Sequence, residues 1–298
     1  MPAKLNETAL HTTALYDQAA SLLEKKLITD PNNTQLLRLL VDNSRQRGQL
    51  QAAKVYCERL LCLEPDHTHA RYLHTILHEK PLDIQSDNML PAPFIRREGI
   101  LNSIEQQTVW RCIAQQYNNF KPSEVIAGSN KNIRRSQLIT AKKKTELHVI
   151  KSWLIPKVKA AISDKLACFS MPHMVFGKTE LQLTLHGDKD YLKTHTDVLK
   201  SQPIGASAYQ YEKIKSRKIS FVYYLHSLPK RFTGGELLLF DTHLMHDTYN
   251  PQHTRIAPQH NSLVLFPSQF YHQVTPVTCT ADPLQHGRFT LNGWLHEK

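Results

Sequence analysis

The sequence NSLVLFPSQFYHQVTPV (residues 261–277), followed by GRFTLNGWL (287–295), carries the clearest strand pattern in the chain. Short runs of β-branched, aromatic and other apolar residues alternate there with Pro, Ser and Gly, as is typical of strands joined by turns. Three further segments share the pattern: MVFGKTELQLTLH (174–186), KISFVYYLH (218–226) and GGELLLFD (234–241). Many short strands of this kind predict a jelly roll, with its core over about residues 170–298.

The N-terminal part of the chain differs, because its apolar residues recur at helical spacing. Four segments show this spacing: LYDQAASLLEKKL (15–27), TQLLRLLVDNSRQR (34–47), LQAAKVYCERLLCL (50–63) and HARYLHTIL (69–77). Pro31 and Pro65 lie 34 residues apart in matching acid–proline turns, with Gly48 between two helices. A 34-residue helix–turn–helix repeat is typical of tetratricopeptide proteins. We therefore predict a tetratricopeptide-like domain over residues 1–83, with one full repeat from Asn32 to Pro65.

This helical domain has two interpretations. Two or three repeats are the lower limit for a stable solenoid, so the domain either caps the rest of the chain or offers a concave surface to a peptide or protein partner. The linker to the second domain, residues 84–298, is expected within PLDIQSDNMLPAPF (81–94), which has isolated prolines and little periodicity.

Two segments before the strands also have helical spacing: LNSIEQQTVWRCIAQQY (101–117) and TELHVIKSWLIPKVKAAISDKLA (145–167). Asn102 or Ser103 is the expected N-cap of the first, with Glu105 in its first turn. The second is expected to break before Pro156. The predicted fold class is therefore α+β, a small helical domain followed by a β domain with supporting helices.

Composition places the chain among ordinary globular proteins. It has 298 residues, of which 41% are hydrophobic and 21% charged. The N-terminus is polar where a signal peptide would be apolar, and no apolar run is long enough to span a membrane, so we expect no membrane partner and a cytoplasmic location. The five cysteines are scattered without a CxxC motif, which favours free thiols in a reducing compartment and argues against a structural zinc site.

The chain is basic, with a formal net charge of +11 and clusters at KNIRRS (131–136) and AKKK (141–144). A solvated basic face explains these clusters most simply. The alternative is attraction of an anionic partner such as nucleic acid or an acidic peptide.

Three residues have the chemistry and spacing of metal ligands. His195 and Asp197 are two residues apart in YLKTHTD, where an extended segment would point both side chains the same way, and His272 follows the strand-like run LVLF. Two imidazoles and one carboxylate form the facial triad that binds Fe(II) and leaves positions open for chemistry. A second His-x-Asp, His186 to Asp188, has Gly187 at its centre and is expected to be an exposed turn that positions ligands poorly.

Arg288 lies on a strand whose alternation places Thr290, Asn292 and Trp294 on the same face. An arginine in an inward-facing row is costly unless it meets an anion, and its guanidinium matches a carboxylate in two-point geometry. That carboxylate belongs either to a bound molecule or to an Asp or Glu of the chain.

From about Leu90 to the C-terminus the chain resembles the prolyl 4-hydroxylase-type Fe(II)/2-oxoglutarate dioxygenases. Five segments carry the resemblance in order: His195-x-Asp197, RKISFVYYL (217–225), FTGGELLLFD (232–241), LFPSQFYHQVTPV (265–277) and GRFTLNGWL (287–295). The resemblance implies a double-stranded β-helix, with Fe(II), 2-oxoglutarate and O2 as cofactor and co-substrates, and ascorbate as a candidate addition.

The resemblance also assigns residues. It implies that His195, Asp197 and His272 bind iron and that Arg288 binds the distal carboxylate of 2-oxoglutarate. Smaller roles follow for Thr290 and Tyr224, which assist Arg288, for the Gly234-Gly235 turn, and for Arg135-Ser136 in a strand before the core. Taken alone, Tyr224 is equally an ordinary buried aromatic residue.

Sequence differences between this chain and other members of the family indicate which reaction to expect. Halogenating relatives have a small residue in place of the carboxylate, so Asp197 favours hydroxylation. Nucleic-acid-repair relatives carry an R-x5-R pattern after the distal histidine, whereas Arg288 is the only arginine beyond His272. A nucleic-acid substrate is therefore not expected.

The prediction is a hydroxylase of an unactivated C–H bond, with a prolyl residue of a peptide or protein as its substrate and the helical domain presenting it. Two alternatives stay open: hydroxylation of a free amino acid, sugar acid or biosynthetic intermediate, or a non-catalytic tetratricopeptide scaffold. Residues 198–216 are expected to form a lid-like loop, and residues 242–260 a polar surface loop.

Overall fold

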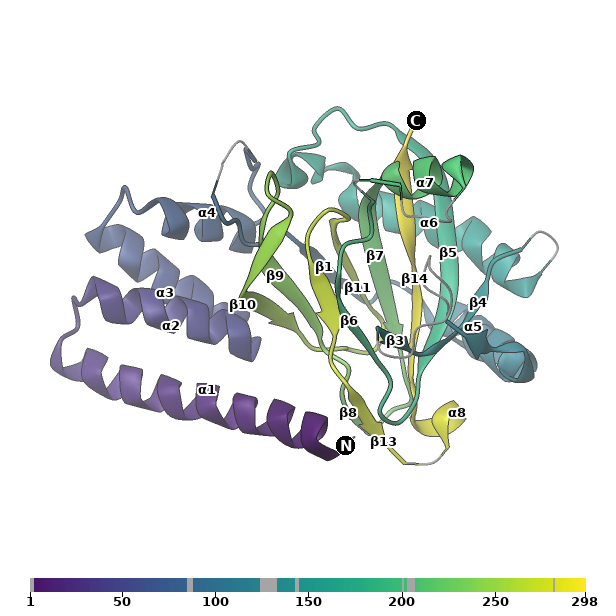
Figure 1. Cartoon of the computed structure of the whole chain (residues 1–298), viewed down its shortest axis with the longest axis horizontal. Helices are drawn as coiled ribbons and strands as arrows, with labels where there is room; N and C mark the ends of the chain where they lie inside the picture. Colours follow the sequence, from purple (N-terminus) through teal and green to yellow (C-terminus); the bar gives the residue numbers. More distant parts are fainter. Residues whose placement is uncertain are drawn as a thin grey trace.

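The computed structural model describes residues 3–84, 88–123, 133–142, 145–199, 201–202, 207–280 and 282–298. Within these ranges a layer of helices leads into two packed antiparallel sheets, and further helices lie behind the larger sheet (Figure 1). The predicted α+β architecture with a jelly-roll domain is confirmed. None of the described helices is long and apolar enough to cross a membrane.

Seven strands form the larger sheet, in the order β1 (Ile95–Glu98), β11 (Ser262–Pro267), β7 (Arg217–Leu225), β14 (Arg288–Glu297), β5 (Phe176–His186), β4 (Gln137–Thr140) and β2 (Lys121–Pro122). Five form the smaller sheet, in the order β10 (Thr248–Ile256), β9 (Leu237–His243), β12 (His272–Val274), β6 (Tyr191–His195) and β3 (Arg134–Arg135). A two-stranded ribbon joins β13 (Val277–Cys279) to β8 (Phe232–Gly234). The segment HQVTPVT (272–278) divides between β12 and β13, and Pro276, which lacks an N–H, lies in the gap between the two strands.

The two faces of the larger sheet have different neighbours. On β14, Phe289, Leu291 and Leu295 belong to the main apolar core, which they share with helices α5 (Ser103–Gln116) and α6 (Glu146–Ser163). The alternate residues of β14 face the smaller sheet and line a cavity between the sheets, as predicted for Arg288, Thr290, Asn292 and Trp294. The period of two along this strand therefore separates the core from the site.

The helix signals were partly correct. Asn102 is the N-cap of α5, and its side chain and that of Glu105 form a reciprocal capping box. The expected break before Pro156 is wrong, because α6 continues through it to Ser163. A proline inside a helix costs about 3 kcal/mol. Burial of Ile150, Leu154, Val158 and other apolar residues of α6, at roughly 1.5–3 kcal/mol each, outweighs that cost.

The expected polar loop over residues 242–260 is also wrong, because about half of it, Thr248–Ile256, is the edge strand β10, paired with β9. Its polar side chains obscured the strand pattern since they meet a helix rather than the apolar core: Arg255 Nε donates to the Gln46 carbonyl at 2.8 Å, and Arg45 Nε donates to Thr254 Oγ1 at 3.2 Å.

Part of the expected loop over residues 198–216 is the helix α7 (Ala208–Lys215), which begins with a capping box between Ser207 and Gln210. Residues 200 and 203–206 of that segment lie outside the described residues. So do residues 131–132 and 143–144 of the two basic clusters, and residues 85–87 of the expected linker.

The N-terminal helices are α1 (Ala3–Thr29), α2 (Thr34–Arg47), α3 (Leu50–Leu63) and α4 (Thr68–Leu77). Gly48 ends α2 with a φ of 74°, in the left-handed region that glycine adopts without strain. These helices have their own apolar cluster, while Ile76 and Leu82 pack into a second cluster with Tyr224 and Leu239 of the sheets. The short helices are η1 (Tyr117–Asn119), η2 (Leu166–Phe169) and α8 (Pro283–His286).

Candidate metal and co-substrate site

Two of the three predicted metal ligands lie on neighbouring strands of the smaller sheet. His195 ends β6, His272 begins β12, and the two residues are direct partners in the antiparallel register, with ring centroids 4.2 Å apart. Asp197 was expected within the strand, but it lies two residues beyond the end of β6. Its backbone N–H donates to the Ser268 carbonyl at 3.0 Å, which holds its carboxylate beside the histidines. One ligand atom from each of the three residues lies within 4.8 Å of the others.

Hydrogen bonds to backbone carbonyls define which imidazole nitrogen is free. His195 Nδ1 lies 2.8 Å from the Lys193 carbonyl, and His272 Nδ1 lies 3.0 Å from the Phe270 carbonyl. A carbonyl only accepts, so each Nδ1 carries the proton of that hydrogen bond, and Nε2 is the nitrogen left to face the cavity. The two Nε2 atoms face Asp197, at 3.6 Å from Oδ1 for His195 and 3.4 Å from Oδ2 for His272.

The charge states suit metal binding. Burial and the neighbouring His272 lower the pKa of His195, so this imidazole is neutral. Burial alone would raise the pKa of Asp197, but His272 and His195 hold it well below its usual value, so the carboxylate is ionised. A neutral imidazole and an ionised carboxylate are the forms that coordinate a metal.

Ser220 positions the carboxylate, and our reading of the sequence missed it. Its hydroxyl donates to Asp197 Oδ2 at 2.6 Å and lies 2.9 Å from the Ser268 hydroxyl. A serine inside the apolar run KISFVYYL was the available signal, because a buried hydroxyl needs a partner.

Arg288 is buried, with 2% of its surface exposed, and lines the same cavity as the three residues. Its guanidinium lies 5.0 Å from the centre of the Tyr224 ring, and its Nη1 lies 3.2 Å from His186 Nδ1. Among the described residues no carboxylate forms an ion pair with Arg288, and its Nε and the Tyr224 hydroxyl have no hydrogen-bond partner. An internal salt bridge, the alternative raised for this arginine, is therefore not what the described structure holds.

The second His-x-Asp does not form a ligand pair. His186 was expected to be exposed, yet it is buried at the end of β5, opposite Arg288 in the strand register. Burial and the charges of Arg288 and Arg134 hold the pKa of His186 well below its usual value, so the ring is neutral and its Nδ1 accepts from Arg288. Asp188 points elsewhere and accepts a hydrogen bond from the Cys279 N–H at 3.2 Å.

Comparisons with known proteins identify the family of this chain. Residues 181–296 match the model of the 2OG-Fe(II) oxygenase superfamily. An uncharacterized PKHD-type hydroxylase from Synechocystis sp. is 30% identical over 225 residues, which cover 74% of this chain and 69% of the relative. This chain belongs to the 2OG-Fe(II) oxygenase superfamily. It is therefore an Fe(II)- and 2-oxoglutarate-dependent dioxygenase that uses O2.

One solved structure shares the fold of this oxygenase. A prolyl hydroxylase from Trichoplax adhaerens, in complex with a hypoxia inducible factor peptide fragment, superposes with a TM-score of 0.50 and 15% identity, covering 68% of this chain and 83% of that one. A prolyl-4-hydroxylase from Pseudomonas putida gives a TM-score of 0.48 and 16% identity over 70% of this chain and 94% of that one.

The oxygenase cavity contains a second arginine that our reading of the sequence did not select. Arg134, the neighbour of the predicted Arg135, lines the cavity, and its Nε donates to Ser136 Oγ at 2.9 Å. Burial lowers the pKa of Arg134 to about 10, against the opposing effect of Asp197. Arg135 instead forms an ion pair with Asp190 at 3.0 Å. The alternation of a strand explains why only one of the two neighbouring arginines faces inward.

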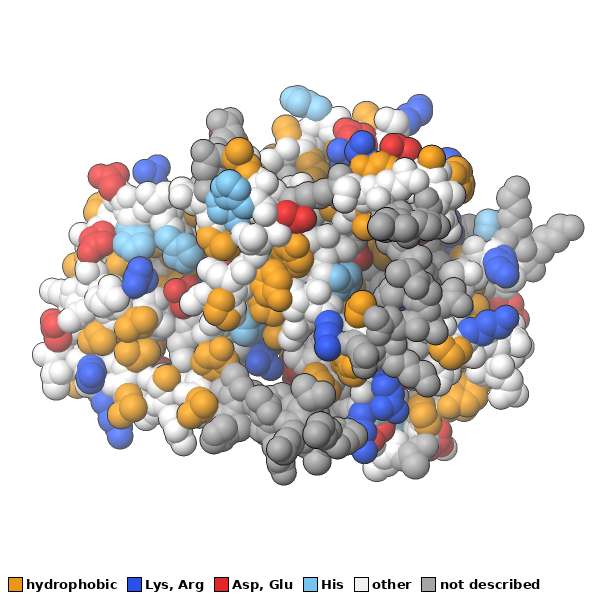
Figure 2. Space-filling model, viewed as in Figure 1, with side chains coloured by type: hydrophobic (Ala, Val, Ile, Leu, Met, Phe, Trp, Pro, Cys, Tyr) orange, Lys and Arg blue, Asp and Glu red, His pale blue; other side chains and the backbone are white. Residues whose placement is uncertain are grey.

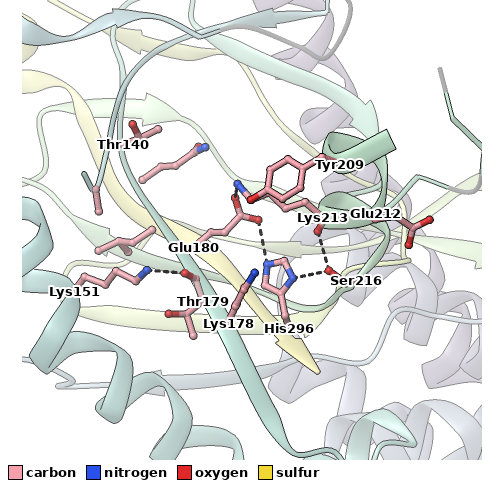
Figure 3. Close-up of a pocket in the computed structure, with 13 residues that line it drawn as sticks. Thr140, Lys151, Lys178, Thr179, Glu180, Tyr209, Glu212, Lys213, Ser216 and His296 are labelled. Carbon is pink, nitrogen blue, oxygen red and sulfur yellow. Dashed lines mark hydrogen bonds and ion pairs between the residues drawn. The ribbon is translucent and has the colours of Figure 1, made fainter. Parts of the chain in front are cut away.

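A larger pocket of about 740 Å³ lies next to the cavity and is lined by residues of β4, β5, α6, α7 and β14 (Figure 3). Glu180 points into it and accepts from Lys213 Nζ at 2.6 Å, Arg217 Nε at 2.9 Å and His296 Nε2 at 3.1 Å. Arg217 also stacks on Trp294 at 3.5 Å and donates to the Asp197 carbonyl at 3.3 Å. We call this pocket the vestibule; Arg217, which pairs with Glu180 of the vestibule, stacks on Trp294 of the cavity.

Proposed function

We propose that His195, Asp197 and His272 bind the Fe(II) of this oxygenase. The support is chemical: two imidazole nitrogens and one carboxylate converge from β12 and from the end of β6 and the residues just after it, and the donor types match the facial triad of non-haem Fe(II) enzymes. Ser220 would hold the carboxylate in place, because it already donates to the oxygen that faces His272.

We propose in addition that Arg288 binds the distal carboxylate of 2-oxoglutarate, with Tyr224 and Thr290 beside it. The observation that carries this proposal is the buried guanidinium without a carboxylate partner among the described residues, in the cavity that also holds the three candidate ligands. A buried, unpaired charge is costly, so a bound anion would stabilise it. The neutral His186 ring would keep the guanidinium oriented towards the cavity.

The candidate residues then have separate roles in the reaction. Iron, when bound with 2-oxoglutarate and O2, supplies the oxidising power that converts 2-oxoglutarate to succinate and CO2 and hydroxylates a C–H bond. Arg288 anchors one end of the co-substrate, and its distance from the ligands fixes which end meets the metal. Asp197 fills the position that a halogenating relative leaves to chloride, so hydroxyl is the group delivered.

We infer that the substrate is a prolyl residue of a peptide or protein. The vestibule of about 740 Å³ has room for several residues of an extended chain, and its lysine, glutamate and tyrosine side chains offer polar contacts (Figure 3). The hydroxylase relative and the shared fold with a prolyl hydroxylase that holds a peptide support this choice.

Two measurements, made one after the other, test the proposed function. Anaerobic addition of Fe(II) and 2-oxoglutarate to the full chain is expected to produce the weak visible charge-transfer band of the chelate; its absence, without O2-dependent succinate formation, would refute the iron site. Succinate release is then screened against proline-containing peptides and a metabolite panel, with mass spectrometry for the gain of one oxygen atom. Turnover with a free metabolite and none with any peptide would mean that the substrate is a small molecule and not a peptide.

A further inference from the structure

Outside the proposed iron site, three metal-binding side chains meet on the N-terminal helices. His74 and His78 are one helical turn apart at the end of α4, with ring centroids 4.1 Å apart, and Glu58 reaches them from α3. One ligand atom from each of the three lies within 4.8 Å of the others. Figure 2 shows histidine side chains at the surface over α3 and α4, where an ion from solvent has access.

The hydrogen bonds of the His78 ring show why its contact with Glu58 is informative. His78 Nδ1 lies 2.9 Å from the His74 carbonyl, which only accepts, so Nδ1 carries a proton. In a neutral ring the other nitrogen, Nε2, then presents a lone pair, yet it lies 3.0 Å from Glu58 Oε1. Two acceptors at that distance repel unless a second proton or a metal cation lies with them.

The proposed iron site shows the same arrangement. His195 and His272 also donate from Nδ1 to a backbone carbonyl and turn Nε2 towards a carboxylate. Donation from the far nitrogen to a backbone carbonyl is the usual way in which a protein orients a metal-binding histidine. Among the described residues the pattern thus occurs in both clusters, at His195 and His272 in one and at His78 in the other.

The donor set indicates the kind of ion. Two imidazole nitrogens and one carboxylate suit Zn²⁺ and its late first-row neighbours, whereas Ca²⁺ and Mg²⁺ prefer oxygen ligands throughout. Ligand atoms that each lie about 2.0–2.2 Å from zinc are roughly 3–3.5 Å from one another, which includes the separation of His78 and Glu58.

We propose that Glu58, His74 and His78 form a second metal site, which binds Zn²⁺ or a similar late transition-metal ion and leaves coordination positions for water. A metal there would link α3 to α4. Because Ile76 of α4 packs into the cluster shared with the sheets, the same ion would stiffen the junction between the helices and the oxygenase fold.

The test uses the full-length chain with His272→Ala in the background, so that the iron site does not contribute to binding. Isothermal titration with Zn²⁺, and Co²⁺ titration followed by visible absorption, are expected to show one equivalent bound. Adding Glu58→Gln or His78→Ala should weaken that binding at least about ten-fold, since even the loss of an outer hydrogen-bond partner weakens metal sites by 10–100-fold.

The matched control is His69→Ala, on the same helix. His69 also faces a carboxylate, at 3.6 Å from Asp42, but the described residues give that pair no third ligand. Its removal should leave Zn²⁺ affinity unchanged, and circular dichroism checks that every variant is folded. If Glu58→Gln and His78→Ala bind Zn²⁺ as tightly as the control does, the cluster is only a hydrogen-bonded pair and the proposal is wrong. Because Zn²⁺ affinity is measured in the His272→Ala background, that outcome would not depend on whether the proposed iron site is correct.

Discussion

At the scale of single residues, the geometry separates two histidine–aspartate pairs that look alike in the sequence. We expect His272→Ala and Asp197→Ala each to reduce O2-dependent succinate formation to background, because each removes one of three candidate iron ligands. Asp188→Ala is the control, since its carboxylate accepts from the Cys279 N–H and does not reach the cavity. Full activity in either of the first two variants would mean that the ligands are assigned to the wrong residues.

Ser220 supports a second prediction at this scale. Ser220→Ala removes the hydroxyl that donates to Asp197 Oδ2, and we expect Fe(II) affinity to fall about 10–100-fold in an anaerobic titration. Ser262→Ala is the matched control, because Ser262 is also a buried strand serine but donates to the Gln259 carbonyl. Equal affinities in the two variants would show that Ser220 does not position the carboxylate.

At the scale of elements, Glu180 joins β5 to α7, β7 and β14 through Lys213, Arg217 and His296, respectively. Burial alone would raise the pKa of Glu180, but hydrogen bonds from His296 and Arg217 and the charge of Arg217 lower it far below its usual value. A carboxyl whose folded-state pKa is depressed stabilises the protein above its unfolded pKa, about 4.3, and loses that contribution as the pH falls from there through the folded value.

Glu180→Gln should therefore lower the free energy of unfolding by roughly 2 kcal/mol near pH 7. In urea titrations the difference from the unmodified protein should stay constant between about pH 5 and 8 and shrink below about pH 4. Glu212→Gln, also in the vestibule but exposed, is the control and should change little. A difference that widens in acid would contradict the direction of the pKa shift.

Among the helices and strands, some were predictable from sequence patterns and others were not. The strand β14 and the capping box of α5 were predictable, because alternation and capping depend on residues close together in the chain. The strand β10 and the continuation of α6 through Pro156 were not, because a partner helix or a buried face decides each of them.

At the scale of the whole molecule, one buried arginine joins the N-terminal helices to the smaller sheet. Arg45 of α2 is 1% exposed, and its Nη2 lies 2.6 Å from Asp241 of β9. We expect Arg45→Ala to lower the free energy of unfolding by about 3–5 kcal/mol, because it leaves Asp241 buried and unpaired. Arg47→Ala removes a pair with the exposed Asp17 and should cost about 1 kcal/mol or less in the same denaturation assay.

A loss as small for Arg45→Ala as for Arg47→Ala would mean that other contacts hold the helices and the oxygenase fold together, such as the apolar cluster and the hydrogen bond from Arg255 to the Gln46 carbonyl. The expected large loss would mean that the two parts unfold together. The predicted boundary between residues 83 and 84 would then mark a change in sequence pattern and not a border between two independently stable domains.

The sequence by itself determined the class of chemistry, the jelly-roll strands, the three candidate ligands and the inward row that starts at Arg288, since each follows from residue type and local spacing. Only the tertiary structure decided that His186 is buried beside Arg288, that Ser220 holds Asp197, and that Glu58 meets His74 and His78. Each of those three facts is a contact between different elements of the chain. Spacing along one strand or helix carries no information about such contacts, because packing chooses the partner.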